Sequence, residues 1–126
     1  MKRRALFTTL MAVTLLPVLS APAKAQQMNA SEIEDLLAGN TIKGAWSGEQ
    51  YRQYFAEDGA TVYVADDGER EHGRWRVDRD KQVYESWWPS TGWIPYAMVD
   101  VPDGEYAWLN GDRMETFEVE EGRRIE

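Results

Sequence analysis

The chain has 126 residues, of which 22 are acidic and 14 basic, and it contains one His and no Cys. Without Cys there is no disulfide framework and no thiolate-based zinc site. The formal charge of −8 argues against binding to nucleic acid or to anionic membrane surfaces.

Residues 1–25 are typical of a secretory signal peptide. Three basic residues at positions 2–4 precede an apolar run over 5–19, and Ala23-Lys24-Ala25 matches an A-x-A cleavage site. The run is too short to favour spanning a bilayer, although an uncleaved anchor is the alternative. We therefore expect a periplasmic or secreted protein, cleaved after Ala25 and without a stable membrane anchor.

The processed chain, residues 26–126, has the length of one domain. The leader holds four of the 14 basic residues and none of the 22 acidic ones, which leaves ten basic residues and a net charge of −12. This charge favours solubility, and it also allows attraction to a basic partner.

Residues 31–38 predict a short helix. Ser31 is placed to cap it, with Glu34 three residues later as in a capping box, and Gly39 is placed to end it. Its apolar residues share one face: Ile33, Leu36 and Leu37. Because so short a helix is unstable alone, we expect it to dock on one end of a sheet.

From Thr41 onward the sequence alternates short strands with turns such as Asp58-Gly59 and Asn110-Gly111. Eight strands are predicted, at about 41–47, 49–56, 60–66, 70–77, 81–88, 93–101, 105–109 and 112–119. The connections are too short for crossover helices, so the sheet should be an antiparallel meander. The predicted fold is all-β, an eight-stranded small barrel or alternatively a β-sandwich.

Two local features modify this prediction. Pro95 indicates an edge strand, a bulge or a gap in barrel closure, because proline cannot donate to a sheet ladder. The charged tail after Val119 is expected to fray.

The strand around Trp75 has the clearest alternation in the chain. One face carries Trp75 and Val77, which we predict to be core, and the other carries the basic row Arg70, His72, Arg74 and Arg76. This row is expected either to pair with acidic residues such as Glu85 across strands, or to line a polar interior as an anion site.

A second cluster consists of Trp87, Trp88 and Trp93 around one turn. Trp87 and Trp88 are adjacent, so in a strand they must face opposite ways. The rings therefore indicate a ligand-binding or contact patch, or else one core ring together with Trp93 closing a barrel end.

Gly44-Ala45-Trp46, which follows the helix and opens the first strand, resembles the G-x-W motif of the calycin superfamily, the lipocalins and their relatives. The resemblance implies a barrel whose floor is closed by Trp46, with Arg113 stacked on that ring. The chain is shorter than a typical lipocalin and lacks a long helix after the barrel, which implies a small or filled interior.

A second resemblance covers more of the chain. The segments Tyr51–Phe55, Asp58-Gly59 and Gly73–Asp78 resemble those of short exported bacterial proteins of unknown function. This resemblance implies no activity.

Catalytic and metal-binding patterns are weak. His72 has no nucleophile or carboxylate at triad spacing, and the acidic turns 66–69 and 78–80 lack the ligand order of an EF-hand. The many carboxylates select no pair for glycoside hydrolysis. We expect no enzyme activity, no cofactor and no metal.

The sequence thus predicts a non-catalytic exported module that binds a small ligand through an aromatic patch or cavity. The predicted ligand-binding residues are Trp87, Trp88, Trp93, Arg74 and Arg76, and Trp46 and Trp75 are predicted to be core. The alternative is an acidic interaction or inhibitor module for a basic protein such as a lysozyme, whose binding would weaken with salt.

Overall fold

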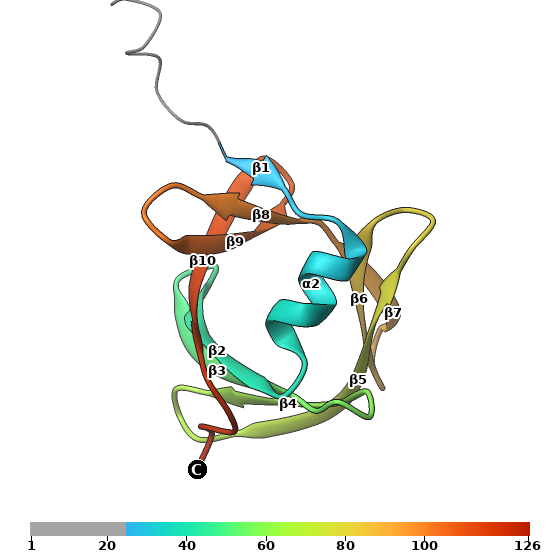
Figure 1. Cartoon of the computed structure of the whole chain (residues 1–126). Coiled ribbons are helices and arrows are strands. Elements are labelled where there is room, and N and C mark those ends of the chain that lie inside the picture. Colours follow the sequence, from blue (N-terminus) through green and yellow to red (C-terminus); the bar gives the residue numbers. More distant parts are fainter. Residues whose placement is uncertain (1–24) are drawn as a thin grey trace, which may run out of the picture.

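The computed structural model describes residues 25–126 (Figure 1), so the predicted leader lies outside the described residues except for Ala25. Within this range one short helix accompanies a single antiparallel sheet that curls into a half-barrel. The helix is α2 (Ala30–Leu37), and the strands are β1 (Gln26–Gln27), β2 (Asn40–Trp46), β3 (Glu49–Phe55), β4 (Ala60–Ala65), β5 (Arg70–Asp78), β6 (Val83–Trp88), β7 (Gly92–Tyr96), β8 (Met98–Val101), β9 (Glu105–Asn110) and β10 (Arg113–Glu120). Their order in the sheet is β1-β8-β9-β10-β2-β3-β4-β5-β6-β7. The predicted all-β class with one N-terminal helix is confirmed.

The predicted number of eight strands is wrong for the described residues, which form ten. The predicted strand 93–101 is divided at Ala97 into β7 and β8, and β1 adds a short pairing to β8. Pro95 lies in β7, which is an edge of the sheet, as its missing N–H predicts. At the corner, the Ala97 carbonyl accepts a hydrogen bond from Leu109 N at 2.9 Å. Consecutive strands thus diverge here, and no β7–β8 ladder closes the barrel.

Helix α2 begins at a different cap from the predicted one. Asn29, not Ser31, is the N-cap: Asn29 Oδ1 accepts from Glu32 N at 2.8 Å, and Glu32 Oε1 accepts from Asn29 N at 2.9 Å. The capping box is therefore present but begins two residues earlier, because Asn caps as well as Ser does. Gly39, at φ +82°, follows the C-cap as predicted.

The cap gives a testable prediction. Asn29→Ala should lower the free energy of unfolding by about 1 kcal/mol, because it leaves the Glu32 N–H without its acceptor. Ser31→Ala, at an exposed position of the first turn, should change it by less than about 0.5 kcal/mol. Urea denaturation measures both changes, and a larger loss for Ser31→Ala would contradict the observed cap.

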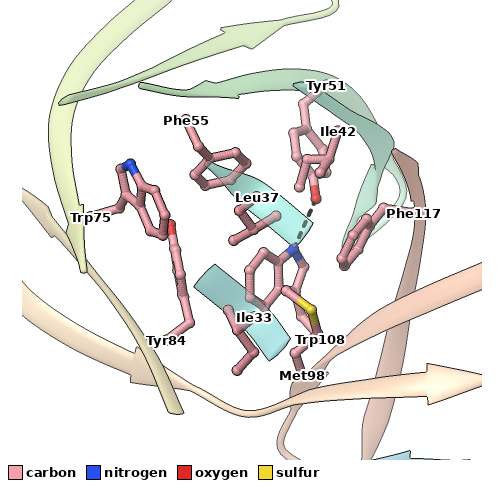
Figure 2. Packing of buried hydrophobic residues seen from close by; sticks show 10 residues of the cluster. All are labelled: Ile33, Leu37, Ile42, Tyr51, Phe55, Trp75, Tyr84, Met98, Trp108 and Phe117. Atoms are coloured by element: carbon pink, nitrogen blue, oxygen red, sulfur yellow. Dashed lines mark hydrogen bonds between the residues drawn. The ribbon is translucent and has the colours of Figure 1, made fainter. Parts of the chain in front are cut away.

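The helix lies within the ring that the curled sheet forms in Figure 1. Ile33 and Leu37 are fully buried and point into a cluster of aromatic side chains (Figure 2). This cluster includes Phe55, Trp75 and Tyr84. The prediction that the helix docks its apolar face on the sheet agrees with this packing, which stabilises a helix too short to persist alone.

Helix α2 occupies one end of the half-barrel. Asn40, at the start of β2, donates from its side chain to Leu36 O at 2.9 Å, and Gly39 N donates to Phe55 O at the end of β3 at 2.7 Å. Gln82, just before β6, accepts from Ala30 N through its side chain at 2.7 Å. The opposite ends of β2, β3 and β6 carry Trp46, Glu49 and Trp88, so these residues lie at the end away from the helix.

Trp75 is confirmed as core, with 6% of its surface exposed, whereas Val77 is only half-buried. The four basic row residues of β5 are exposed on the other face of that strand. An interior anion site formed by this row is therefore wrong. Arg76 lies opposite Glu85 in the register, and its Nε is 2.7 Å from Glu85 Oε1, which is the cross-strand pair offered as the alternative.

The C-terminal tail does not fray as predicted. Ile125 is buried, and Arg70 donates to its carbonyl oxygen at 2.9 Å. Thr41 Oγ1 donates to Gly122 O at 2.7 Å and accepts from Arg124 N at 2.9 Å. A charged composition suggested fraying, but the tail is held by hydrogen bonds between its backbone and side chains of β2 and β5, and by the buried Ile125.

Candidate functional site

A cavity of about 300 Å³ lies at the end of the half-barrel away from α2. Side chains from β2, β3, β4, β5, β6, β7 and β9 line it, together with the turn between β6 and β7. No residue of the helix contributes to this lining. The helix therefore fills one end of the half-barrel and leaves the other for a cavity of the size that small ligands occupy.

The inner part of the cavity is formed by Tyr51, Tyr84 and Trp108, all buried. Trp108 Nε1 donates to the Tyr51 hydroxyl at 3.2 Å, shown dashed in Figure 2, and the Tyr84 and Trp108 ring centroids are 4.5 Å apart. Burial raises the pKa of both tyrosine hydroxyls far above the usual range. These phenols are therefore uncharged at any physiological pH.

Two pairs of half-buried rings form the walls. Trp46 and Tyr96 meet edge to face with centroids 5.2 Å apart, and Tyr63 and Trp88 do so at 6.3 Å. Strand alternation explains why Trp88 faces the cavity: Tyr84, Ser86 and Trp88 lie on the inner face of β6. Ser86 lies opposite Trp75, which is on the inner face of β5. Seven aromatic rings thus face one small space.

Gly73 makes room for the Trp88 ring. A Cβ atom on Gly73 would lie 2.6 Å from Trp88 Cε3 and 2.3 Å from Trp87 O, closer than non-bonded atoms approach. Any larger residue at position 73 would therefore displace the ring from the cavity wall.

The polar lining consists of Gln53, Glu71, Ser86, Ser90 and Thr91. Gln53 and Ser86 are buried: Gln53 Nε2 donates to Thr61 Oγ1 at 2.9 Å, and the Ser86 hydroxyl accepts from Trp88 Nε1 at 3.1 Å. Glu71, Ser90 and Thr91 are exposed. Glu71 is the one lining residue with a carboxylate, and it lies at the start of β5 at the cavity mouth.

The structure divides the predicted ligand-binding residues between two faces. Trp88 lines the cavity, whereas Arg74, Arg76, Trp87 and Trp93 lie on the outer face of β5, β6 and β7. There Arg74 is opposite Trp87, Trp87 is opposite Trp93, and the Arg76 guanidinium lies 3.8 Å from the Trp93 ring centroid. Ligand binding by this outer patch stays a prediction.

Trp46 was predicted to be a core residue, but it is not fully buried. It shares the inner face of β2 with Ile42 and Gly44, but it lies at the helix-distal end, where it lines the cavity and is half-buried. Arg113 Nη2 lies 3.7 Å from Glu115 Oε2. In the part of the chain that the structure describes, the Arg113 guanidinium is not stacked on the Trp46 ring. Trp46 contacts Tyr96 instead.

Of the seven rings, sequence reasoning selected only Trp88 as a site residue. It placed Trp46 in the core and did not select Tyr51, Tyr63, Tyr84, Tyr96 and Trp108. Strand alternation could have indicated Tyr84, because it is four residues from Trp88 and so faces the same side of the strand. Alternation does not show how far the sheet curls, and it is the curl that brings the ends of distant strands together.

Comparison with protein-family models, with curated proteins and with solved structures found no match. The calycin-like resemblance therefore stays a prediction. Within residues 25–126, no group of three or more His, Cys, Asp or Glu side chains is arranged to hold a metal ion. The described helix is not long and apolar enough to cross a membrane.

Proposed function

We propose that this chain is an exported, non-catalytic binding module that holds a small ligand in the aromatic cavity at the helix-distal end of the half-barrel. The observation that carries the proposal is the convergence of seven rings on a space of about 300 Å³. Rings on facing strands offer a large apolar contact area with few rotatable bonds, which lowers the entropic cost of holding a ligand.

Two features support a cavity that is kept open for a ligand. Gly73 has no side chain, and the Trp88 ring packs in the space that a Cβ atom would take and lines the cavity there. The helix seals the opposite end with Ile33 and Leu37. The fold thus has one closed end and one lined with half-buried aromatic residues, which is the arrangement of a binding site.

The non-catalytic part of the proposal rests on the chemistry of the lining. Its hydroxyls are those of Tyr, Ser and Thr, and His72, the one imidazole of the chain, lies on the outer face of β5. A serine nucleophile needs an adjacent general base. Export rests on the leader described above, and periplasmic or secreted location is part of the proposal.

The test is native mass spectrometry of the protein released gently from the cells that export it. We expect a reproducible small adduct that is absent from Trp88→Ala and retained by Trp93→Ala, which removes a matched ring from the outer face. Loss of the adduct in Trp93→Ala alone would move the site to the outer patch of Arg74, Arg76, Trp87 and Trp93.

The same experiment separates the alternative function. A protein-sized partner that dissociates at high salt would replace the ligand-binding proposal with an acidic interaction module for a basic protein such as a lysozyme. A bare protein with neither adduct nor partner would count against both.

A further inference from the structure

We infer that the cavity selects a small organic cation, such as a quaternary or protonated amine, held against the aromatic faces and attracted by the Glu71 carboxylate. This inference rests on the proposed ligand-binding function and specifies the class of its ligand. It follows from the charge of the lining, the location of the basic side chains and the hydrogen bonds that the N–H donors of the lining already make within the protein.

The lining combines aromatic faces with one negative charge and no positive one. Of its twelve residues, seven are aromatic, Glu71 carries a carboxylate and none is Lys, Arg or His. The face of an aromatic ring attracts a cation through its quadrupole, most strongly for Trp and Tyr. An anionic ligand would find the same faces and the same carboxylate repulsive.

Three carboxylates lie close enough to the cavity to act on its tyrosines. Burial raises the pKa of Tyr63, and Glu49 and Glu71 raise it further through their negative charges. Glu115, itself buried, contributes in the same direction at Tyr51, and the exposed guanidinium of Arg113, 3.7 Å from its Oε2, offsets part of its charge. Glu71 in the lining, with Glu49 also acting on Tyr63, therefore favours entry of a cation.

The basic side chains nearest in the sheet are directed elsewhere. Arg70, Arg74 and Arg76 lie on the outer face of β5, where Arg70 holds the C-terminal tail and Arg76 pairs with Glu85. Strand alternation sends each of these arginines away from the cavity that Glu71 faces. Alternation along β5 thus places the Glu71 carboxylate on the inner face of the sheet and the three arginines on the outer face.

The buried polar groups also favour a cation over a neutral polar ligand. Three N–H donors of the lining already donate within the protein: Trp108 to Tyr51, Gln53 to Thr61, and Trp88 to Ser86. Among the groups that remain at the cavity for a ligand are the Glu71 carboxylate and the ring faces, and both prefer a positive partner.

The experiment compares choline with its uncharged carbon isostere, 3,3-dimethylbutan-1-ol, by calorimetry and by Trp fluorescence of the purified protein. The two probes have the same shape, so their difference measures the charge. We expect choline to bind about tenfold more tightly than the isostere. Glu71→Gln should weaken choline binding about fivefold and leave the isostere unchanged, because an exposed carboxylate contributes a modest attraction.

Glu118→Gln is the matched control. Glu118 is exposed on β10 next to the inward-facing Phe117, and its substitution removes the same charge without touching the cavity lining. It should keep the preference for choline. Circular dichroism and thermal melting confirm that both variants retain the fold.

The outcomes separate this inference from the proposed function. Equal affinity for the two probes, or equal weakening of choline binding by both variants, overturns cation selection and leaves cavity binding intact. Failure of both probes to bind a protein that yields a small adduct from its own cells also overturns the cation class. Failure of both probes with no adduct overturns the inference and the proposed function together.

Discussion

Trp75→Ala is expected to lower the free energy of unfolding by about 3–5 kcal/mol, as truncation of a buried Trp does. Trp75 is 6% exposed, its ring meets Phe55 edge to face at 5.5 Å, and its Nε1 donates to Ala56 O at 2.8 Å. The change therefore removes apolar contacts and a hydrogen-bond donor, and it opens a void beside the Phe55 and Tyr84 rings. Packing does not easily close such a void.

Trp93→Ala is the matched control for this prediction. Trp93 is 37% exposed on the outer face of β7, so its loss should cost no more than about 1 kcal/mol, chiefly through its contact with Arg76. Chemical denaturation followed by circular dichroism measures both variants without relying on Trp fluorescence. Equal losses in the two variants would contradict the inward direction of Trp75.

Most strands of this fold could be predicted from local sequence because their signals are local, whereas the break at Ala97 and the short strand β1 were not predicted. Turn dipeptides such as Asp58-Gly59 mark hairpins, and alternation around Trp75 fixes which face of β5 is buried. Pro95 indicated the edge strand for the same reason, since a missing N–H is a property of a single residue.

The cavity could not be predicted in the same way, because it depends on how far the sheet curls. Trp46 shows the difference: alternation gives it the inner face of β2, yet its burial depends on whether α2 covers that end of the half-barrel. The helix covers the other end, and Trp46 becomes a wall of the cavity. Alternation likewise predicts that Trp87 and Trp88 face opposite sides of the sheet. It does not show which ring is the inner one, and the strand register shows that it is Trp88.

The residue at which the helix begins depends on which of two residues caps it. Asn29 and Ser31 are both good N-caps, and each is followed three residues later by a Glu. The choice of Asn29 adds residues at the N-terminal end of α2 and buries Ala30 beside Gln82, whose side chain accepts from Ala30 N. That contact is made by a distant residue, so the local sequence could not decide between the two caps.

Gly73→Ala is expected to lower the free energy of unfolding by about 1–3 kcal/mol, as overpacking does, and to abolish binding in the cavity. The added methyl group would lie 2.3 Å from the backbone oxygen of Trp87 and 2.6 Å from the Trp88 ring. Rotation of the ring alone cannot relieve the first contact, so strand β6 must move and carry Trp88 with it.

Gly44→Ala separates loss of stability from loss of the site. Its added methyl group would lie 2.6 Å from Thr116 O and 2.8 Å from Phe117 Cβ, so it overpacks the β2–β10 pair in the same way but does not touch Trp88. We expect similar destabilisation from the two variants, measured by urea denaturation, and ligand retention only in Gly44→Ala, measured as the adduct in native mass spectra. Retention of the adduct by Gly73→Ala would show that the position of the Trp88 ring does not matter for binding. Loss of the adduct in both variants would mean that binding follows overall stability, and the role of Gly73 as the residue that keeps the cavity wall in place would then be wrong.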